Sequence, residues 1–169
     1  MIITAVWVPG HPKTKGSLDF FGNGKVRETV DNKAWRELVT GAVRRDIETR
    51  HAERVTRALD HRLPEPYAGP VAVDTTFWLD HPDVYGPSSQ AGDLDKLIRL
   101  IGDALKDAGA YKDDNQIALF PLPIKLPSRG IPGDAGALIV VRSVSAEELA
   151  LLTVDAGNRR IAIQAGSLR

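Results

Sequence analysis

The sequence predicts an α/β (α+β) fold in a single domain, because strand-like segments and amphipathic helices alternate along the chain. Residues 71–79 alternate apolar and polar side chains, which is typical of a half-buried strand. Residues 94–108 repeat leucine and isoleucine at steps of three and four, which is typical of a helix with one buried face. The 169 residues are 43% hydrophobic and 26% charged, which allows one domain with a real core.

The chain opens with a strand and a basic loop. Residues 2–8 are β-branched and aromatic and end at Pro9-Gly10, so we expect a strand there. Residues 10–27 are rich in glycine and lysine, which blocks regular structure and predicts a basic loop. That loop has room for a short hairpin over residues 20–26.

The next element is a long helix. It is expected to start near Asp31, a good N-cap residue, and to run past residue 50. The pattern leaves open whether residues 54–63 extend this helix or form a second one. The apolar stripe that defines the helix consists of Trp35, Leu38, Val39, Ala42, Val43 and Ile47.

The second half is expected to continue the alternation. A proline-rich loop leads into the strand at 71–79, and the helix at 94–108 has a suitable stop at Gly109. Residues 116–125 are expected to be extended, and residues 137–142 form the last expected strand.

The C-terminal segment is the most ambiguous part of the sequence. Ser145 is a suitable cap for a short helix that ends at Leu152. The remaining residues, 153–169, fit either a short strand at 160–163 or a frayed tail. We therefore expect a domain over residues 1–152 and a C-terminal extension over residues 153–169.

Charge and cysteine content narrow the function classes. The 22 basic and 22 acidic residues give zero net charge, which alone argues against a nucleic-acid partner. The charges are uneven, however: 12 − 8 = +4 over residues 1–63, 4 − 10 = −6 over 64–115, and 6 − 4 = +2 over 116–169. An acidic centre between basic flanks suits a metal site beside a phosphate-binding surface, although such fluctuations also occur by chance.

The sequence has no cysteine, which excludes disulfides, thiolate zinc sites and cysteine nucleophiles. No basic, apolar leader and no run of about 18 apolar residues is present, so we expect a cytoplasmic protein with no membrane partner.

Aspartates cluster around the helix at residues 94–108. Asp93 and Asp95 flank its start, Asp103 lies within it, and Asp113-Asp114 follow it. If the next segment pairs near the start of the helix, Asp114 can approach Asp93 and Asp95. Carboxylates held that close repel one another unless a cation neutralises them, and Mg²⁺ or Mn²⁺ is the natural partner. The alternative is that acids at a helix N-terminus simply complement its dipole.

These motifs resemble those of the RusA family of Holliday junction resolvases. That family has an Asp-Leu-Asp-Asn motif opening a helix, an Asp-Ala-Leu within it, an Asp-Asp pair shortly after, and a Gly-x-Pro-x-x-Lys opening. The resemblance covers roughly residues 3–125. It rests on runs 93–97, 103–105 and 113–117, and on Gly10, Pro12, Lys13, Lys15 and Gly16.

The resemblance implies a small mixed β-sheet packed against two main helices, and a homodimer. It implies Mg²⁺-dependent paired nicking of four-way or other branched DNA in recombination and repair, by a bacterial or phage-encoded enzyme. Asp93, Asp95 and Asp114 match the essential metal-binding carboxylates, and Asp113 matches a less central neighbour.

The sequence departs from the family pattern at two positions. Lys96 stands where the family has asparagine, and Arg99 stands where it has the catalytic lysine. Arg99 lies one helical turn from Asp95 and can pair bidentately with a phosphate, but arginine cannot serve as a neutral amine. The other residues expected to contact DNA are Lys13, Lys15, Lys25, Arg27, Lys96 and Lys125.

Two alternatives remain at this stage. The chain could be a catalytically weakened protein of the same fold that only binds branched DNA, with Arg99 marking the loss of chemistry. Alternatively, Asp93-Leu94-Asp95 could belong to a nucleotide-sugar glycosyltransferase, although such enzymes normally need a larger nucleotide-binding domain.

Overall fold

A mixed five-stranded sheet forms the centre of the computed structural model, which describes residues 1–15, 18–21, 25–28, 32–58, 65–81, 83–86, 91–131 and 133–164. The strand order is β1-β7-β4-β5, and β6 also pairs with β4. The strands β1, β7 and β4 are antiparallel neighbours, whereas β5 and β6 run parallel to β4. Their bounds are β1 Ile2–Pro9, β4 Val71–Leu79, β5 Ile117–Leu119, β6 Ile124–Pro127 and β7 Gly136–Ser143.

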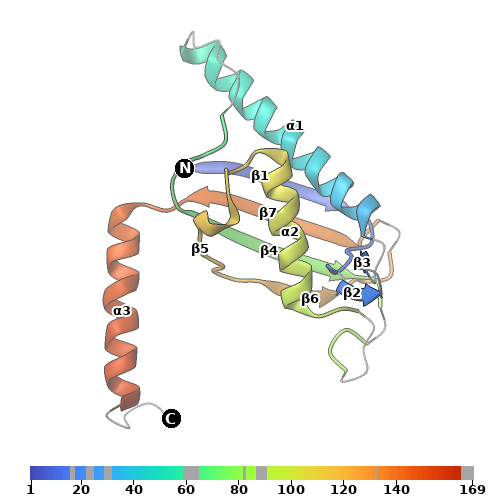
Figure 1. Ribbon diagram of the computed structural model, residues 1–169. Helices are drawn as coiled ribbons and strands as arrows, with labels where there is room; N and C mark the ends of the chain where they lie inside the picture. The colour runs from blue at the N-terminus through green and yellow to red at the C-terminus, as the bar shows by residue number, and fades with distance from the viewer. Residues whose placement is uncertain are drawn as a thin grey trace.

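Two helices pack against the sheet and a third stands apart (Figure 1). Helix α1 (Lys33–Ala58) contacts β1 and α2, and α2 (Leu94–Ala108) runs across the sheet face. Helix α3 (Ala146–Gln164) extends away from the sheet after β7. The predicted fold class, a single α/β domain with a mixed sheet and two main packed helices, is therefore confirmed.

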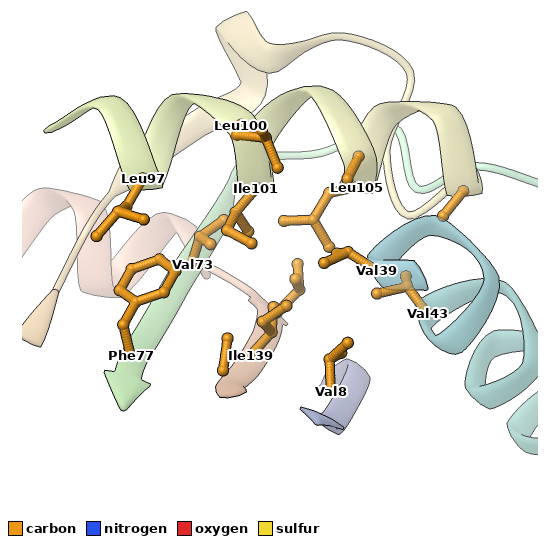
Figure 2. Packing of buried hydrophobic residues seen from close by; sticks show 14 of the residues in the cluster. Val8, Val39, Val43, Val73, Phe77, Leu97, Leu100, Ile101, Leu105 and Ile139 are labelled. Carbon is orange, nitrogen blue, oxygen red and sulfur yellow. The ribbon is translucent and has the colours of Figure 1, made fainter. Parts of the chain in front are cut away.

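The core lies between α2 and the sheet (Figure 2). Leu97, Ile101 and Leu105 of α2 are buried and point toward Phe77 of β4 and Ile139 of β7. Each such side chain contributes about 1.5–3 kcal/mol of favourable burial free energy. The apolar stripe predicted for α2 thus fixes which face of this helix meets the sheet and which remains open.

Helix α2 has the predicted bounds, and Gly109 ends it as expected. Gly109 adopts φ +81°, a left-handed conformation that favours glycine. The N–H groups of Gly109 and Ala110 donate to the carbonyls of Lys106 and Leu105, both at 3.0 Å. The chain therefore leaves the helix in a sharp turn and returns toward the start of β4, where Ile117 of β5 pairs with Val71.

The predicted N-terminal elements are confirmed, and α1 resolves one open choice. The expected hairpin is formed by β2 (Leu18–Phe21) and β3 (Lys25–Glu28). Helix α1 continues to Ala58, so the first part of the 54–63 segment extends it. The residue before α1 is Asn32, whose carbonyl accepts from the Arg36 N–H; the predicted cap Asp31 lies outside the described residues.

Two expectations for the C-terminal half were wrong in detail. Residues 116–125 are not one extended segment, because the one-turn helix η1 (Asp114–Gln116) precedes β5 and Pro121 and Pro123 separate β5 from β6.

Helix α3 does not end at Leu152 but runs to Gln164, so residues 160–163 are neither a strand nor a tail. No proline interrupts this segment, and a helix satisfies its own backbone hydrogen bonds without a neighbouring strand. The predicted cap is confirmed, since the Glu148 N–H donates to Ser145 Oγ at 3.1 Å.

None of the described helices is both long and apolar enough to cross a membrane.

Candidate metal and DNA site on helix α2

The start of α2 presents two aspartates, as the sequence predicted. Asp93 is the N-cap residue and has extended backbone, with φ −76° and ψ 136°. Its carbonyl accepts the first helical hydrogen bond, from the Leu97 N–H at 3.0 Å, while Asp95 lies in the first turn. Both side chains are well exposed, at 68% and 59% of their surface.

The turn after α2 orients Asp114. Asp113 caps η1: its side chain accepts from the Asn115 N–H at 3.1 Å, and the Gln116 side chain accepts from the Asp113 N–H at 3.0 Å. The hydrogen bond from Asn115, followed by that from Lys106 at 3.0 Å, lowers the pKa of the Asp113 carboxyl. Asp113 therefore stabilises the turn, and Asp114 is the member of the pair that lines the adjacent pocket.

A hollow of about 500 Å³ brings together residues from both ends of α2. Asp95 and Arg99 come from its first half, and Asp103 comes from its second half. Asp114 comes from η1, and Lys15 comes from the basic loop. The lining is completed by Ile98, Gly102, Ile117 and Phe120. Asp95 and Asp114, which the sequence predicted to approach each other, thus line the same hollow.

The structure does not gather all three predicted carboxylates in this pocket. Asp93 is not among the lining residues, and its carboxylate pairs with Lys96 Nζ at 3.2 Å. Within the described part of the chain, no three acidic or histidine side chains lie close enough together to hold a metal ion as they stand. The pocket nevertheless has three carboxylates against two cations, so its formal charge is −1.

The carboxylates of the site also act on a buried tyrosine beneath them, Tyr111. The Tyr111 hydroxyl is buried and donates to the Gly102 carbonyl at 2.9 Å. Burial, and then the charges of Asp114, Asp103 and Asp113, raise the pKa of Tyr111 above its usual range. The negative field of these carboxylates favours a cation in the pocket.

Arg99 lies one helical turn after Asp95 on α2, as the sequence predicted. Its guanidinium pairs with Asp95 at 2.6 Å, one helical turn away, and both side chains are more than half exposed. Exposed pairs of this kind are typically worth about 0–1 kcal/mol. A phosphate or metal ion can therefore displace either partner at little cost.

The expected DNA-binding residues lie partly beside the start of α2 and partly on the β2–β3 hairpin. Lys15 lines the pocket, and Lys125 of β6 donates to the Gly92 carbonyl at 3.1 Å, just before Asp93. Lys13 lines a second hollow, of about 360 Å³, which Gly92 also lines. Lys25 and Arg27 lie on β3, where they pair in register with Phe21 and Asp19.

Asp103 is the pocket residue to which sequence reasoning gave no role. It belongs to the Asp-Ala-Leu motif, but that motif names no chemistry by itself. The available signal was spacing: Asp95, Arg99 and Asp103 recur every four residues and so share one side of the helix.

Comparison with known families gives a match over the part of the chain that contains this pocket. A family model described as endodeoxyribonuclease RusA matches residues 9–124. The match includes every pocket-lining residue and stops one residue before Lys125. No curated protein sequence matches the chain significantly.

Proposed function

This chain belongs to the RusA family of endodeoxyribonucleases, which resolve Holliday junctions, and we propose that Asp95 and Asp114, together with Asp93, bind the Mg²⁺ ion with which it cuts DNA. The observation that supports this assignment is the pocket lined by Asp95 at the start of α2 and by Asp114 of η1, which follows the helix. The homologous family acts on branched DNA, so the substrate is a four-way junction.

The donor set fits a hard divalent cation. Mg²⁺ prefers oxygen ligands and commonly takes one or two carboxylates, leaving other positions for water and phosphate. Asp95 and Asp114 supply two such groups, and Mn²⁺ accepts the same ligands. When bound, the ion would activate water and stabilise the leaving oxygen of the scissile phosphodiester.

Asp93 joins this set through a side-chain movement that costs little. Its partner Lys96 and the carboxylate itself are exposed, so the ion pair contributes at most about 1 kcal/mol. Asp113 is the weakest of the proposed metal-binding residues, because its carboxylate caps η1 and pairs with Lys106.

The basic residues bind and orient the DNA. Arg99 releases Asp95 and pairs with a phosphate, which its planar guanidinium can do through two hydrogen bonds. Lys96 and Lys125 lie beside the start of α2, and Lys15 lies along the pocket wall at Asp103; all three contact neighbouring phosphates. Lys13, Lys25 and Arg27 extend this contact along the loop and hairpin.

Resolution of a four-way junction requires two symmetric cuts, so we further propose that two copies act together as a homodimer. Residues 1–152 form the nuclease domain, and residues 153–169 are an extension. The enzyme works in the bacterial cytoplasm, where its DNA substrate lies, whether the cell or a phage encodes it.

The test is cleavage of a synthetic four-way junction, compared with flap and linear duplex, each with Mg²⁺. Wild-type protein is expected to nick the junction, and Asp114→Asn is expected to yield no product. Asp107→Asn is the matched control, because Asp107 lies on the same helix but pairs with Arg36 away from the pocket. Retained cleavage by Asp114→Asn would remove Asp114 from the mechanism.

Arg99 supports a second candidate function, a branched-DNA-binding protein with weakened chemistry. Arginine keeps its proton, so any step that needs a neutral amine is lost here. This candidate predicts junction binding in Mg²⁺ or Ca²⁺ without product, and a gain of cleavage in Arg99→Lys. Cleavage by the wild-type protein would exclude it.

A further inference from the structure

The basic loop contacts α2 at two points and the residue before the helix N-cap at a third. Thr14 packs against Gly92, where a side chain would collide with the Thr14 methyl group and where φ is +90°. The Lys15 N–H donates to the Lys96 carbonyl at 3.0 Å, and Lys15 Nζ pairs with Asp103 at 2.7 Å. One of these contacts holds the backbone of the loop, and the other two hold the side chains of Thr14 and Lys15.

The side-chain contact directs Lys15 along the helix. Its backbone is held at Lys96, while its ammonium is held at Asp103, seven residues later and roughly 10 Å further along the helix axis. The stretched side chain therefore forms one wall of the pocket that Asp95 and Asp114 also line.

Asp103 is the least exposed carboxylate among the ion pairs at this site. Its side chain is 25% exposed, against 59% for Asp95 and 68% for Asp93. Lys15 itself is 43% exposed, so its charge remains accessible to a ligand in the pocket. A free lysine at this position would populate many rotamers, and Asp103 selects the one that crosses the pocket wall.

We propose that Asp103 is a positioning residue that aims the Lys15 ammonium at a DNA phosphate bound in the pocket. The inference rests on the proposed nuclease function and extends it to a residue outside the metal-binding set. Because Asp103 acts through Lys15, its removal matters only while Lys15 is present.

A double-mutant cycle tests this dependence. Single-turnover junction cleavage in Mg²⁺ is measured for wild type, Asp103→Asn, Lys15→Gln and the double variant. Each single change is expected to slow cleavage about tenfold, and the double variant is expected to be no slower than the slower single variant. Asp103→Glu keeps the carboxylate and is expected to recover most of the rate. Losses that multiply in the double variant would overturn the proposal, as would a wild-type rate in Asp103→Asn.

The Mg²⁺ dependence separates positioning from metal binding. The Mg²⁺ concentration that gives half the maximal rate is expected to be unchanged in Asp103→Asn. A clear increase would make Asp103 a metal ligand and contradict the proposal.

Junction binding in Ca²⁺ supplies a readout that needs no cleavage. The slope of log binding affinity against log salt concentration is expected to decrease, in both Lys15→Gln and Asp103→Asn, by the amount that about one phosphate contact contributes. It is expected to stay unchanged in the control Lys112→Gln. A wild-type slope in Asp103→Asn would contradict the proposal. Wild-type protein that neither binds nor cuts junctions would instead refute the proposed function itself.

Discussion

Helices α2 and α3 belong to the same chain but are stabilised in opposite ways. In α2 one face is buried against the sheet, a glycine ends the helix, and the other face lines the pocket. In the part of α3 whose side chains the structure describes, large apolar residues remain in contact with solvent: Leu151 is 72% exposed and Val154 is 62% exposed. Its described attachment to the domain lies at its first turn, where Glu148 pairs bidentately with Arg142 of β7.

The difference shows where the function of this chain is concentrated. The buried face of α2 fixes its height and rotation over the sheet, so the acidic residues on its open face occupy defined positions. The family match covers α2 and ends before α3. Substitutions in α2 should therefore change both the free energy of unfolding and the rate of DNA cleavage, whereas substitutions in α3 should change neither by much.

The largest expected effect is on folding. Leu105→Ala removes a fully buried side chain of α2 and is expected to lower the free energy of unfolding by about 2–5 kcal/mol. The matched change in α3, Leu151→Ala, is expected to stay within about 0.5 kcal/mol of wild type. Urea unfolding followed by circular dichroism measures both. A similar cost for the two variants would mean that α3 is packed in solution.

A loss of stability of intermediate size is expected in helix α1, because one of its carboxylates forms hydrogen bonds to β1. Asp46 accepts from Thr4 Oγ1 at 2.8 Å, the Ala5 N–H at 3.0 Å and Arg50 at 2.7 Å. Asp46→Asn is expected to cost about 1–3 kcal/mol of unfolding free energy at pH 7.

The same residue predicts a pH dependence. Burial opposes ionisation of Asp46, but the hydrogen bonds from Arg50, Ala5 and Thr4 outweigh it and lower its pKa. A lowered folded-state pKa gives stability that is present above the unfolded-state value and lost as pH falls through the folded-state value. The gap between wild type and Asp46→Asn should therefore shrink below about pH 4. A gap that widens in acid would contradict this account of Asp46.

The smallest effect is expected from shortening α3. Protein ending at Leu152 keeps Glu148 and its bond to Arg142, so its unfolding free energy should change by less than about 0.5 kcal/mol. Junction cleavage should stay within about twofold of wild type. A loss of cleavage together with a smaller oligomer by light scattering would show that residues 153–169 support the dimer.

Local patterns predicted α2 well and its surroundings less well. Strong apolar periodicity and a glycine stop set its bounds, since both signals lie within the helix itself. The partnership of Asp103 with Lys15 joins residues 88 positions apart, which no local pattern encodes. The role of Asp113 could not be predicted for a different reason. Its carboxylate could equally bind a metal ion or cap a turn, and only the structure of the turn shows that it caps η1. Residues 160–163 alternate over too short a span to distinguish a strand from a continued helix.

The central claim is that Asp95 at the start of α2 and Asp114 just after this helix share one divalent ion. Binding of Mn²⁺ to the junction complex, measured by electron paramagnetic resonance, tests it most directly. Asp95→Asn and Asp114→Asn are each expected to weaken Mn²⁺ binding at least about tenfold, while Asp107→Asn leaves it unchanged. Wild-type Mn²⁺ affinity in either of the first two variants would contradict the claim.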